Sequence, residues 1–183
     1  MTDIHYTSWE PRSSGQPATL VVGKGPEKLA VFGVEKADVS GDTWLLATDG
    51  ANGVRATTTE GREFSATGAG KRAKRVDVDL DGKKLAMVNE NSSNWVVLTA
   101  DQVKIAQFSG TNNGVRRAIL EFVPDAENTE AAQKSIAELS QEDVVALSWF
   151  VRTILEAKLS RMTGMVIVTL VALSILAVLT FLL

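Results

Sequence analysis

The sequence predicts a mainly β protein, an antiparallel β-barrel of about 10 to 12 strands followed by an apolar helix and a single transmembrane helix. Three observations lead to this fold class. Turn-forming clusters of Gly, Asn, Asp and Ser recur about every ten residues between Thr19 and Pro124. A run of apolar residues with helical spacing follows. The last stretch, 162–183, carries no charge, although the chain contains 19 basic and 22 acidic residues.

The segments between the turn clusters are rich in Val, Leu, Thr, Phe and Trp and are the expected strands of a barrel over 18–124, after a polar leader, 1–17. In RVDVDLDGKKLAMV, Val76, Val78 and Leu80 alternate with aspartates before an Asp-Gly pair, which predicts a hairpin with one face in water. The expected strands are TLVVG, LAVFGVE, TWLLAT, VRATTTE, REFSAT, RVDVDL, KKLAMV, NWVVLT, QVKIAQFSG and VRRAILEFV.

Two helices are expected over 125–161. DAENTEAAQKSIAEL is rich in Ala and Glu, with Asp125 as the expected N-cap of a short polar helix. Ser140 and Asp143 then form a capping-box pattern before VVALSWFVRTILEAKL. The apolar positions of this second helix cover more than one narrow stripe. Such a helix is either enclosed by protein or lies at a membrane, and the sequence leaves both open.

The stretch 162–183 is the expected membrane anchor, because a helix of this length spans about 33 Å and a hydrocarbon core is about 30 Å thick. Arg152, Lys158 and Arg161 precede it, and the leader lacks the pattern of a signal peptide. We therefore expect a tail-anchored, single-pass protein with a cytoplasmic N-terminal domain. Gly164 alone separates the second helix from the span, so the two form either one rod or a bent pair.

The strand series from Thr19 to Val123 and the apolar helix LSQEDVVALSWFVRTILEAKLSR resemble the tubby-like and LURP-one-related family, which includes the phospholipid scramblases. The resemblance implies a barrel with a threaded helix and contact with membrane lipids. In size and topology the chain is also similar to small single-span accessory subunits of actinobacterial respiratory supercomplexes of cytochrome bc and oxidase. That similarity implies the bacterial plasma membrane and integral membrane subunits as partners.

The composition excludes several classes of chemistry. Without cysteine there is no disulfide, thiolate metal site or cysteine nucleophile, and the single histidine, His5, excludes a histidine triad or a multi-histidine metal site. No cofactor, nucleotide or nucleic acid is expected, and we expect no enzyme. TGAGKRAKR resembles a phosphate-binding loop, but Ser65 and Arg72 replace its first glycine and its magnesium ligand.

A calcium loop is also disfavoured. Asp77, Asp79, Asp81 and Gly82 match the opening of such a loop, but Val88 stands where the bidentate glutamate is needed. A solvated hairpin is therefore the expected structure of this segment.

The candidate binding residues are a basic group and a partner group. Lys71, Arg72, Lys74 and Arg75 are the expected contacts with anionic lipid, against the simpler interpretation of an exposed, solubilising loop. The expected partner contacts are Trp9, Thr169, Ala172 and Ala177. Trp9 lies in the polar leader, so either a partner or the barrel wall must cover it.

The resulting hypothesis is a non-enzymatic, membrane-anchored accessory or stabilising subunit of a bacterial membrane protein complex. The alternative is a phospholipid-binding protein of the tubby or scramblase type.

Overall fold

The computed structural model describes residues 4–11, 15–49, 53–69, 73–91, 93–109, 118–124 and 126–182. In the C-terminal helix, it describes few side chains beyond residue 158: those of 169, 170, 173, 174 and 180.

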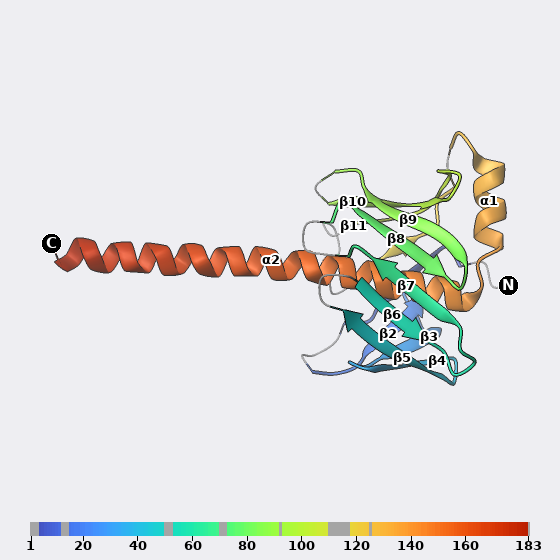
Figure 1. The fold of residues 1–183 in the computed structure, drawn as a ribbon, viewed down its shortest axis with the longest axis horizontal. Helices are drawn as coiled ribbons and strands as arrows, with labels where there is room; N and C mark the ends of the chain where they lie inside the picture. The colour runs from blue at the N-terminus through green and yellow to red at the C-terminus, as the bar shows by residue number, and fades with distance from the viewer. Residues whose placement is uncertain are drawn as a thin grey trace.

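A closed antiparallel barrel of twelve strands forms the body of the protein (Figure 1). Each strand pairs with its neighbours in the sequence, and β1 pairs with β12 to close the barrel. The predicted fold class is therefore confirmed as a mainly β barrel. The strands are β1 Tyr6–Trp9, β2 Ala18–Val22, β3 Lys28–Phe32, β4 Lys36–Val39, β5 Asp42–Asp49, β6 Gly53–Thr57, β7 Glu63–Thr67, β8 Arg75–Leu80, β9 Lys83–Asn89, β10 Asn94–Thr99, β11 Lys104–Ser109 and β12 Leu120–Glu121.

The expected polar leader takes part in the barrel. Its segment Tyr6–Trp9 is β1, which pairs with β2 over three residue pairs and with β12 at Tyr6↔Glu121 and Thr7↔Leu120. Each of the ten expected segments contains a strand, whereas β1 and β4 had no place among them. Both missed strands have four residues and include polar residues, so their local pattern is weak.

The hairpin β8–β9 matches its prediction. Val76, Val78 and Leu80 are buried, and Leu80 pairs with Lys83 across the turn. Asp81 and Gly82 both have positive φ, 53° and 96°, as a two-residue hairpin turn requires. Asp77 is exposed on the opposite face of β8, which is the wet face.

Two helices follow the barrel, α1 Thr129–Ala137 and α2 Gln141–Leu182. The first begins later than expected, with Asn128 at its N-cap and no side-chain cap, while Asp125 lies outside the described residues. The second runs through Gly164 without a break and projects far from the barrel as one rod (Figure 1). In the part of the chain that the structure describes, no helix has the length and apolarity needed to cross a membrane. The side chains of the expected span lie mostly outside that part.

The first half of α2 is threaded through the barrel and forms its core. Leu147 and Phe150 are fully buried, surrounded by the inward-facing residues of the strands. Phe32 of β3 links wall and helix, with its ring centroid 5.2 Å from that of Trp9 and 6.0 Å from that of Trp149. Enclosure by protein is therefore the correct one of the two arrangements that the sequence left open.

One polar contact inside the barrel fixes how α2 is rotated. The Ser148 hydroxyl donates to the Val144 carbonyl at 2.7 Å, and Thr7 Oγ1 of β1 lies 2.7 Å from Ser148 Oγ. Both hydroxyls are buried, so loss of Ser148 leaves the Thr7 hydroxyl without this hydrogen bond, whereas loss of Thr7 leaves Ser148 with its bond to Val144. This pair connects α2 to the strand that closes the barrel.

Replacing Phe150 with Ala tests the threaded arrangement. We expect a loss of about 3–5 kcal/mol in the free energy of unfolding, because a fully buried ring leaves a cavity between helix and wall. Denaturant titration of the full chain in mild detergent measures it. Leu45→Ala, at a side chain that is 56% exposed, is the control and should change little. A loss at Phe150 no larger than at Leu45 would exclude a threaded helix.

Candidate functional site

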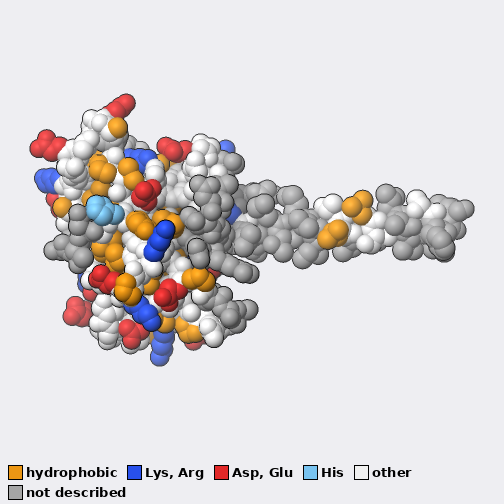
Figure 2. All heavy atoms as spheres, turned by 180° about the vertical axis from the view of Figure 1, so that it is seen from behind, with side chains coloured by type: hydrophobic (Ala, Val, Ile, Leu, Met, Phe, Trp, Pro, Cys, Tyr) orange, Lys and Arg blue, Asp and Glu red, His pale blue; other side chains and the backbone are white. Residues whose placement is uncertain are grey.

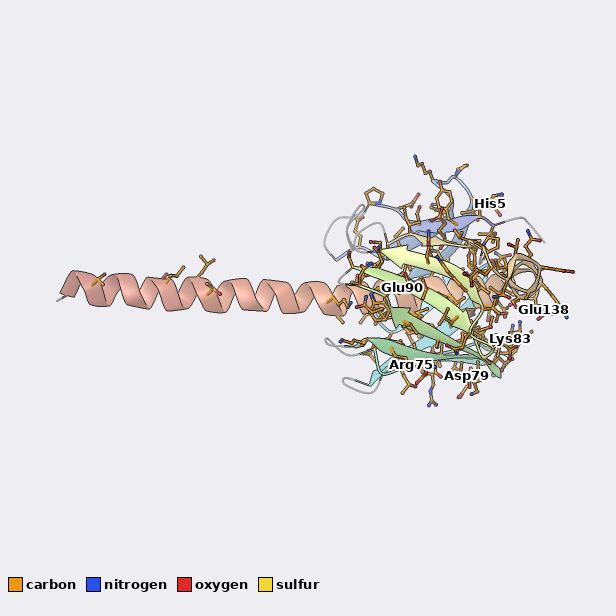
Figure 3. The ribbon with its side chains drawn as sticks, turned by 90° about the horizontal axis from the view of Figure 1, so that it is seen from above. His5, Arg75, Asp79, Lys83, Glu90 and Glu138 are labelled. Atoms are coloured by element: carbon orange, nitrogen blue, oxygen red, sulfur yellow. The ribbon has the colours of Figure 1, made fainter. Side chains whose placement is uncertain are left out.

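The barrel has two chemically different ends, which α2 defines. The end of the barrel at which α2 begins is called the base. The opposite end, where α2 leaves the barrel, is called the mouth. Antiparallel pairing sends successive connections alternately to base and mouth, so the β4–β5, β6–β7 and β8–β9 turns lie at the base. The β3–β4, β7–β8 and β9–β10 connections lie at the mouth. In Figure 3, Lys83 and Glu138 stand at the base, and Arg75 and Glu90 lie nearer the mouth.

At the base, Asp143 organises the start of α2. The Ser140 N–H donates to Asp143 Oδ2 at 2.8 Å, and the Asp143 N–H donates to Ser140 Oγ at 3.1 Å, which confirms the predicted capping box. Lys83 Nζ also donates to Asp143 Oδ2, at 2.6 Å, and to the Glu138 carbonyl, at 2.9 Å. The Asp143 side chain is fully buried, and these donors replace water at Oδ2, whereas Oδ1 has no hydrogen-bond partner among the described residues.

Arg62 extends this network to the neighbouring turns. Its Nε donates to Asp81 at 3.0 Å, its Nη1 pairs with Glu142, and its Nη2 lies 3.8 Å from Asp143 Oδ1. The β6–β7 and β8–β9 turns are thereby tied to the first turn of α2. Acidic side chains are scattered over the visible face of the barrel, among lysines and arginines (Figure 2). The base therefore holds the helix in place through charge.

At the mouth, two cations of α2 lie over indole rings of the wall. The Arg152 guanidinium lies 4.5 Å from the ring centroid of Trp9, and Lys158 Nζ lies 4.3 Å from that of Trp95. Burial lowers the pKa of Lys158 below its ordinary value. These contacts hold the helix at the point where it leaves the barrel.

A hollow of about 600 Å³ lies beside α2 at the mouth, and we call it the mouth hollow. Phe32 and Trp149 form part of its apolar wall, and Val34, which is 94% exposed, stands at the β3–β4 connection on its rim. Arg152 and Glu156 contribute opposite charges, one helical turn apart. The mouth hollow thus combines apolar surface with one cation and one anion.

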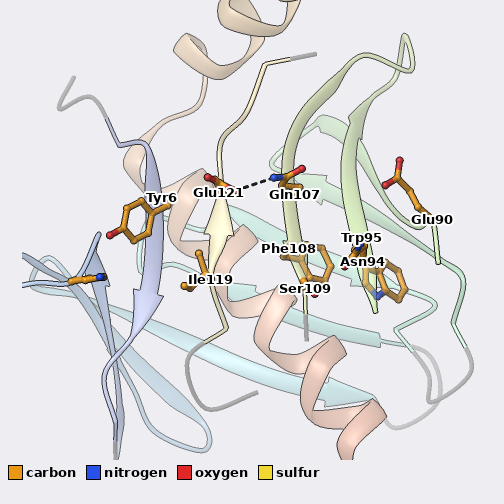
Figure 4. Close-up of a pocket in the computed structure, with 10 residues that line it drawn as sticks. Tyr6, Glu90, Asn94, Trp95, Gln107, Phe108, Ser109, Ile119 and Glu121 are labelled. Carbon is orange, nitrogen blue, oxygen red and sulfur yellow. Dashed lines mark hydrogen bonds between the residues drawn. The ribbon is translucent and has the colours of Figure 1, made fainter. Parts of the chain in front are cut away.

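A second hollow, of about 560 Å³, lies on the wall around β12 (Figure 4). Tyr6, Trp95 and Phe108 line it, and Gln107 Nε2 donates to Glu121 Oε2 at 2.9 Å within it. Because β12 has only two residues, it forms only two residue pairs with each neighbouring strand.

The predicted basic group belongs to the connection between β7 and β8, at the mouth. Lys74 and Arg75 are both exposed, and Arg75 Nε donates to Asp77 at 2.8 Å. Lys71 and Arg72 lie outside the described residues. Lys74, in the β7–β8 connection, and Arg75, the first residue of β8, thus lie at the end from which α2 leaves, a point that the sequence alone left open.

The predicted partner contacts lie in two separate parts of the molecule: Trp9 in β1, and Thr169, Ala172 and Ala177 in α2. Trp9 is 2% exposed, covered by the barrel and by Arg152, so the expected partner contact there is replaced by cover from the wall. Thr169 is exposed on α2. Ala172 and Ala177 have side chains outside the described set.

The aspartates of the rejected calcium motif each have a cationic partner. Asp77 pairs with Arg75, Asp81 with Arg62, and Asp79 with Lys84. The hydrogen bond from Lys84 holds the pKa of Asp79 below its ordinary value. Among the described residues no group of three His, Cys, Asp or Glu side chains could hold a metal ion.

Sequence reasoning missed Arg152 and Glu156 as residues that line the mouth hollow. Their spacing of four residues was a signal for a helical ion pair, but only the threaded helix brings them beside Phe32 and Val34. No family model, curated protein or solved structure matches this chain. The tubby-like resemblance therefore stays a prediction.

Replacing Asp143 with Ala should lower the free energy of unfolding by about 2–4 kcal/mol, because it removes the cap and the charge-assisted bond to Lys83. Denaturant titration of the full chain in mild detergent measures the change. Asp77→Ala is the matched control: its ion pair is exposed, so the loss should stay within about 0.5 kcal/mol. Equal losses in the two variants would contradict a special role for Asp143.

Proposed function

We propose that this protein is a non-enzymatic, membrane-anchored subunit that stabilises a bacterial membrane protein complex, such as a respiratory cytochrome bc–oxidase supercomplex. The observation that carries the proposal is the continuity of α2. One helix begins in the barrel core, where Val145 and Phe150 are fully buried, and continues into the charge-free stretch 162–183. A barrel built around the same helix as its anchor is held at a fixed height above the membrane.

The dimensions favour this arrangement. At about 1.5 Å per residue, 162–182 extends about 31 Å, close to the hydrocarbon thickness of about 30 Å. The few side chains described there include Leu170 and Leu173, which are 58% and 56% exposed. Large apolar side chains on a bare helix are unfavourable in water and favourable in lipid. We propose a single-pass span at this position.

The orientation follows from the charges beside the span. Arg152, Lys158 and Arg161 precede it on α2, and Lys74 and Arg75 lie at the same end of the barrel, where β8 begins. Basic flanks remain on the cytoplasmic side of a bacterial plasma membrane. The barrel is therefore proposed to be cytoplasmic.

Binding rather than catalysis is favoured by the side chains at hand. The sequence has no cysteine and one histidine, and Asp143 is engaged by Lys83 and the backbone of its own capping box. The proposed partners are integral membrane subunits that contact the span and the mouth. Thr169, Ala172 and Ala177 supply small or hydroxyl side chains at which another helix can approach α2 closely.

Co-purification tests the subunit hypothesis. The tagged full chain, extracted in mild detergent, should elute with a large membrane complex at constant stoichiometry across two independent columns. Recovery as a monomer under conditions that preserve known complexes of the same membrane would contradict the hypothesis. Mass spectrometry of the peak identifies the subunits.

A double substitution, Leu170→Asp with Leu173→Asp, tests the anchor itself. Each Asp disfavours insertion by about 2.5–3.5 kcal/mol at the centre of a span, so the variant should move from the carbonate-resistant membrane fraction to the soluble fraction. Leu45→Asp, at an exposed position on the barrel, is the control and should stay with the wild type. If the double variant remains carbonate-resistant, 162–183 is not the anchor.

A second candidate function is phospholipid binding, and the position of the basic connection favours it. Lys74 and Arg75 lie at the mouth, where β8 begins, and both are exposed; Lys71 and Arg72 precede them in the sequence. Each basic residue near an anionic leaflet contributes about 1 kcal/mol to membrane attraction. The apolar half of α2 is enclosed by the barrel, so lipid contact would come from the mouth and not from that helix.

Alanine at Lys71, Arg72, Lys74 and Arg75 together tests this second function. In nanodiscs that contain anionic lipid, protease should cleave the connections at the mouth faster in the variant than in the wild type, because the variant is held less closely to the membrane. The difference should vanish at high salt, because surface attraction is screened. Equal protection at low salt would reject the lipid role of this connection.

A further inference from the structure

The mouth hollow contains a matched pair of opposite charges. Arg152 and Glu156 both line it, and they are the only charged residues among its described lining. They lie four residues apart on α2, and Arg152 Nε donates to Glu156 Oε1 at 2.8 Å. The hollow therefore has no net charge but contains one positive and one negative group.

Arg152 is held in place by the barrel and retains unused donors. Its side chain is 10% exposed and lies over the ring of Trp9. Among the described residues, its side chain makes only the one hydrogen bond, from Nε, although a guanidinium carries five N–H donors. The terminal amino groups are left for another acceptor, and a planar fork of this kind suits phosphate oxygens.

Glu156 provides the complementary acceptor. Its side chain is 49% exposed at the rim, and one of its carboxylate oxygens carries the bond from Arg152. The other oxygen remains for a donor such as a protonated amine. Thr48 and Thr153 add hydroxyl groups to the lining.

We propose that the mouth hollow binds a phosphoethanolamine group, with the phosphate on Arg152 and the ammonium on Glu156. A purely anionic group would meet the Glu156 carboxylate, and a purely cationic group would meet Arg152. A zwitterion satisfies both. The size agrees, because small-molecule sites enclose about 300–1,000 Å³ and the hollow has about 600 Å³.

The position of the hollow suggests a source for this group, and that step rests on the proposed function. Glu156 precedes Met162 by six residues, or about 9 Å along the helix. The headgroup layer of one leaflet is about 5–8 Å thick. The rim of the hollow therefore lies at the outer edge of that layer, beside exposed Val34, where phosphatidylethanolamine headgroups are available.

Titration of the full chain in mild detergent with three soluble esters tests the proposal. Glycerophosphoethanolamine should bind about tenfold more tightly than glycerophosphocholine, whose quaternary ammonium has no N–H to donate to Glu156, and than glycerophosphoglycerol, which has no cation. Isothermal calorimetry or ligand-observed NMR measures the three affinities. Equal affinities, or no binding of any ester, would overturn the proposal.

The decisive variant is Glu156→Gln, at a partly exposed rim position where the fold is easily preserved. It should abolish the preference for glycerophosphoethanolamine. Glu35→Gln removes the same charge at the β3–β4 connection, outside the lining, and should keep the preference. An unchanged preference in Glu156→Gln would overturn the assignment of the ammonium. Arg152→Lys, checked for folding by near-ultraviolet circular dichroism, should weaken all phosphate esters together.

Lipid analysis separates the two sources of the group. If the source is the membrane, phosphatidylethanolamine should be enriched over bulk lipid in the purified wild type and not in Glu156→Gln. If only the soluble ester binds, the hollow recognises free phosphoethanolamine compounds and the membrane source is wrong. If carbonate washing removes the wild-type chain from membranes, the proposed membrane anchor is wrong. The ester titration would still show whether the mouth hollow binds phosphoethanolamine.

Discussion

The enclosure of an apolar helix by the barrel is the constraint on which the rest of the structure depends. A twelve-stranded barrel has an interior that its own inward-facing residues do not fill, and the first half of α2 completes its core. The helix likewise has apolar residues around most of its circumference and needs cover on all sides. Neither part can bury its apolar surface alone, so barrel and helix must fold together.

The polar contacts decide how this assembly is fixed along its axis. At the base, buried Asp143 joins the helix cap to Lys83, and within the core Ser148 contacts Thr7 of the closing strand. At the mouth, Arg152 and Lys158 lie over Trp9 and Trp95. These contacts resist sliding and rotation of α2. Because α2 is fixed in the barrel and continues without a break, its C-terminal part keeps a fixed position relative to the barrel.

The two ends of the barrel divide the charge of the protein. Arg62 and Lys83 at the base are neutralised by carboxylates of the turns and of α2, whereas Lys74 and Arg75 lie exposed at the mouth. The same end contains the neutral but divided pair of Arg152 and Glu156. The two proposals, attraction to an anionic surface and recognition of a zwitterion, thus concern different residues of one face.

Features that depend on near neighbours could be predicted from the sequence: the alternation in β8, the Asp-Gly turn, the capping box of Ser140 and the charge-free stretch 162–183. Local periodicity carries this information, because the side chains involved are a few residues apart. The pairing of Tyr6–Trp9 with β12, the threading of α2 and the contact of Arg152 with Trp9 became clear only from the folded chain. The first and last of these contacts join residues more than a hundred positions apart, and no local pattern specifies which distant surface covers an apolar face.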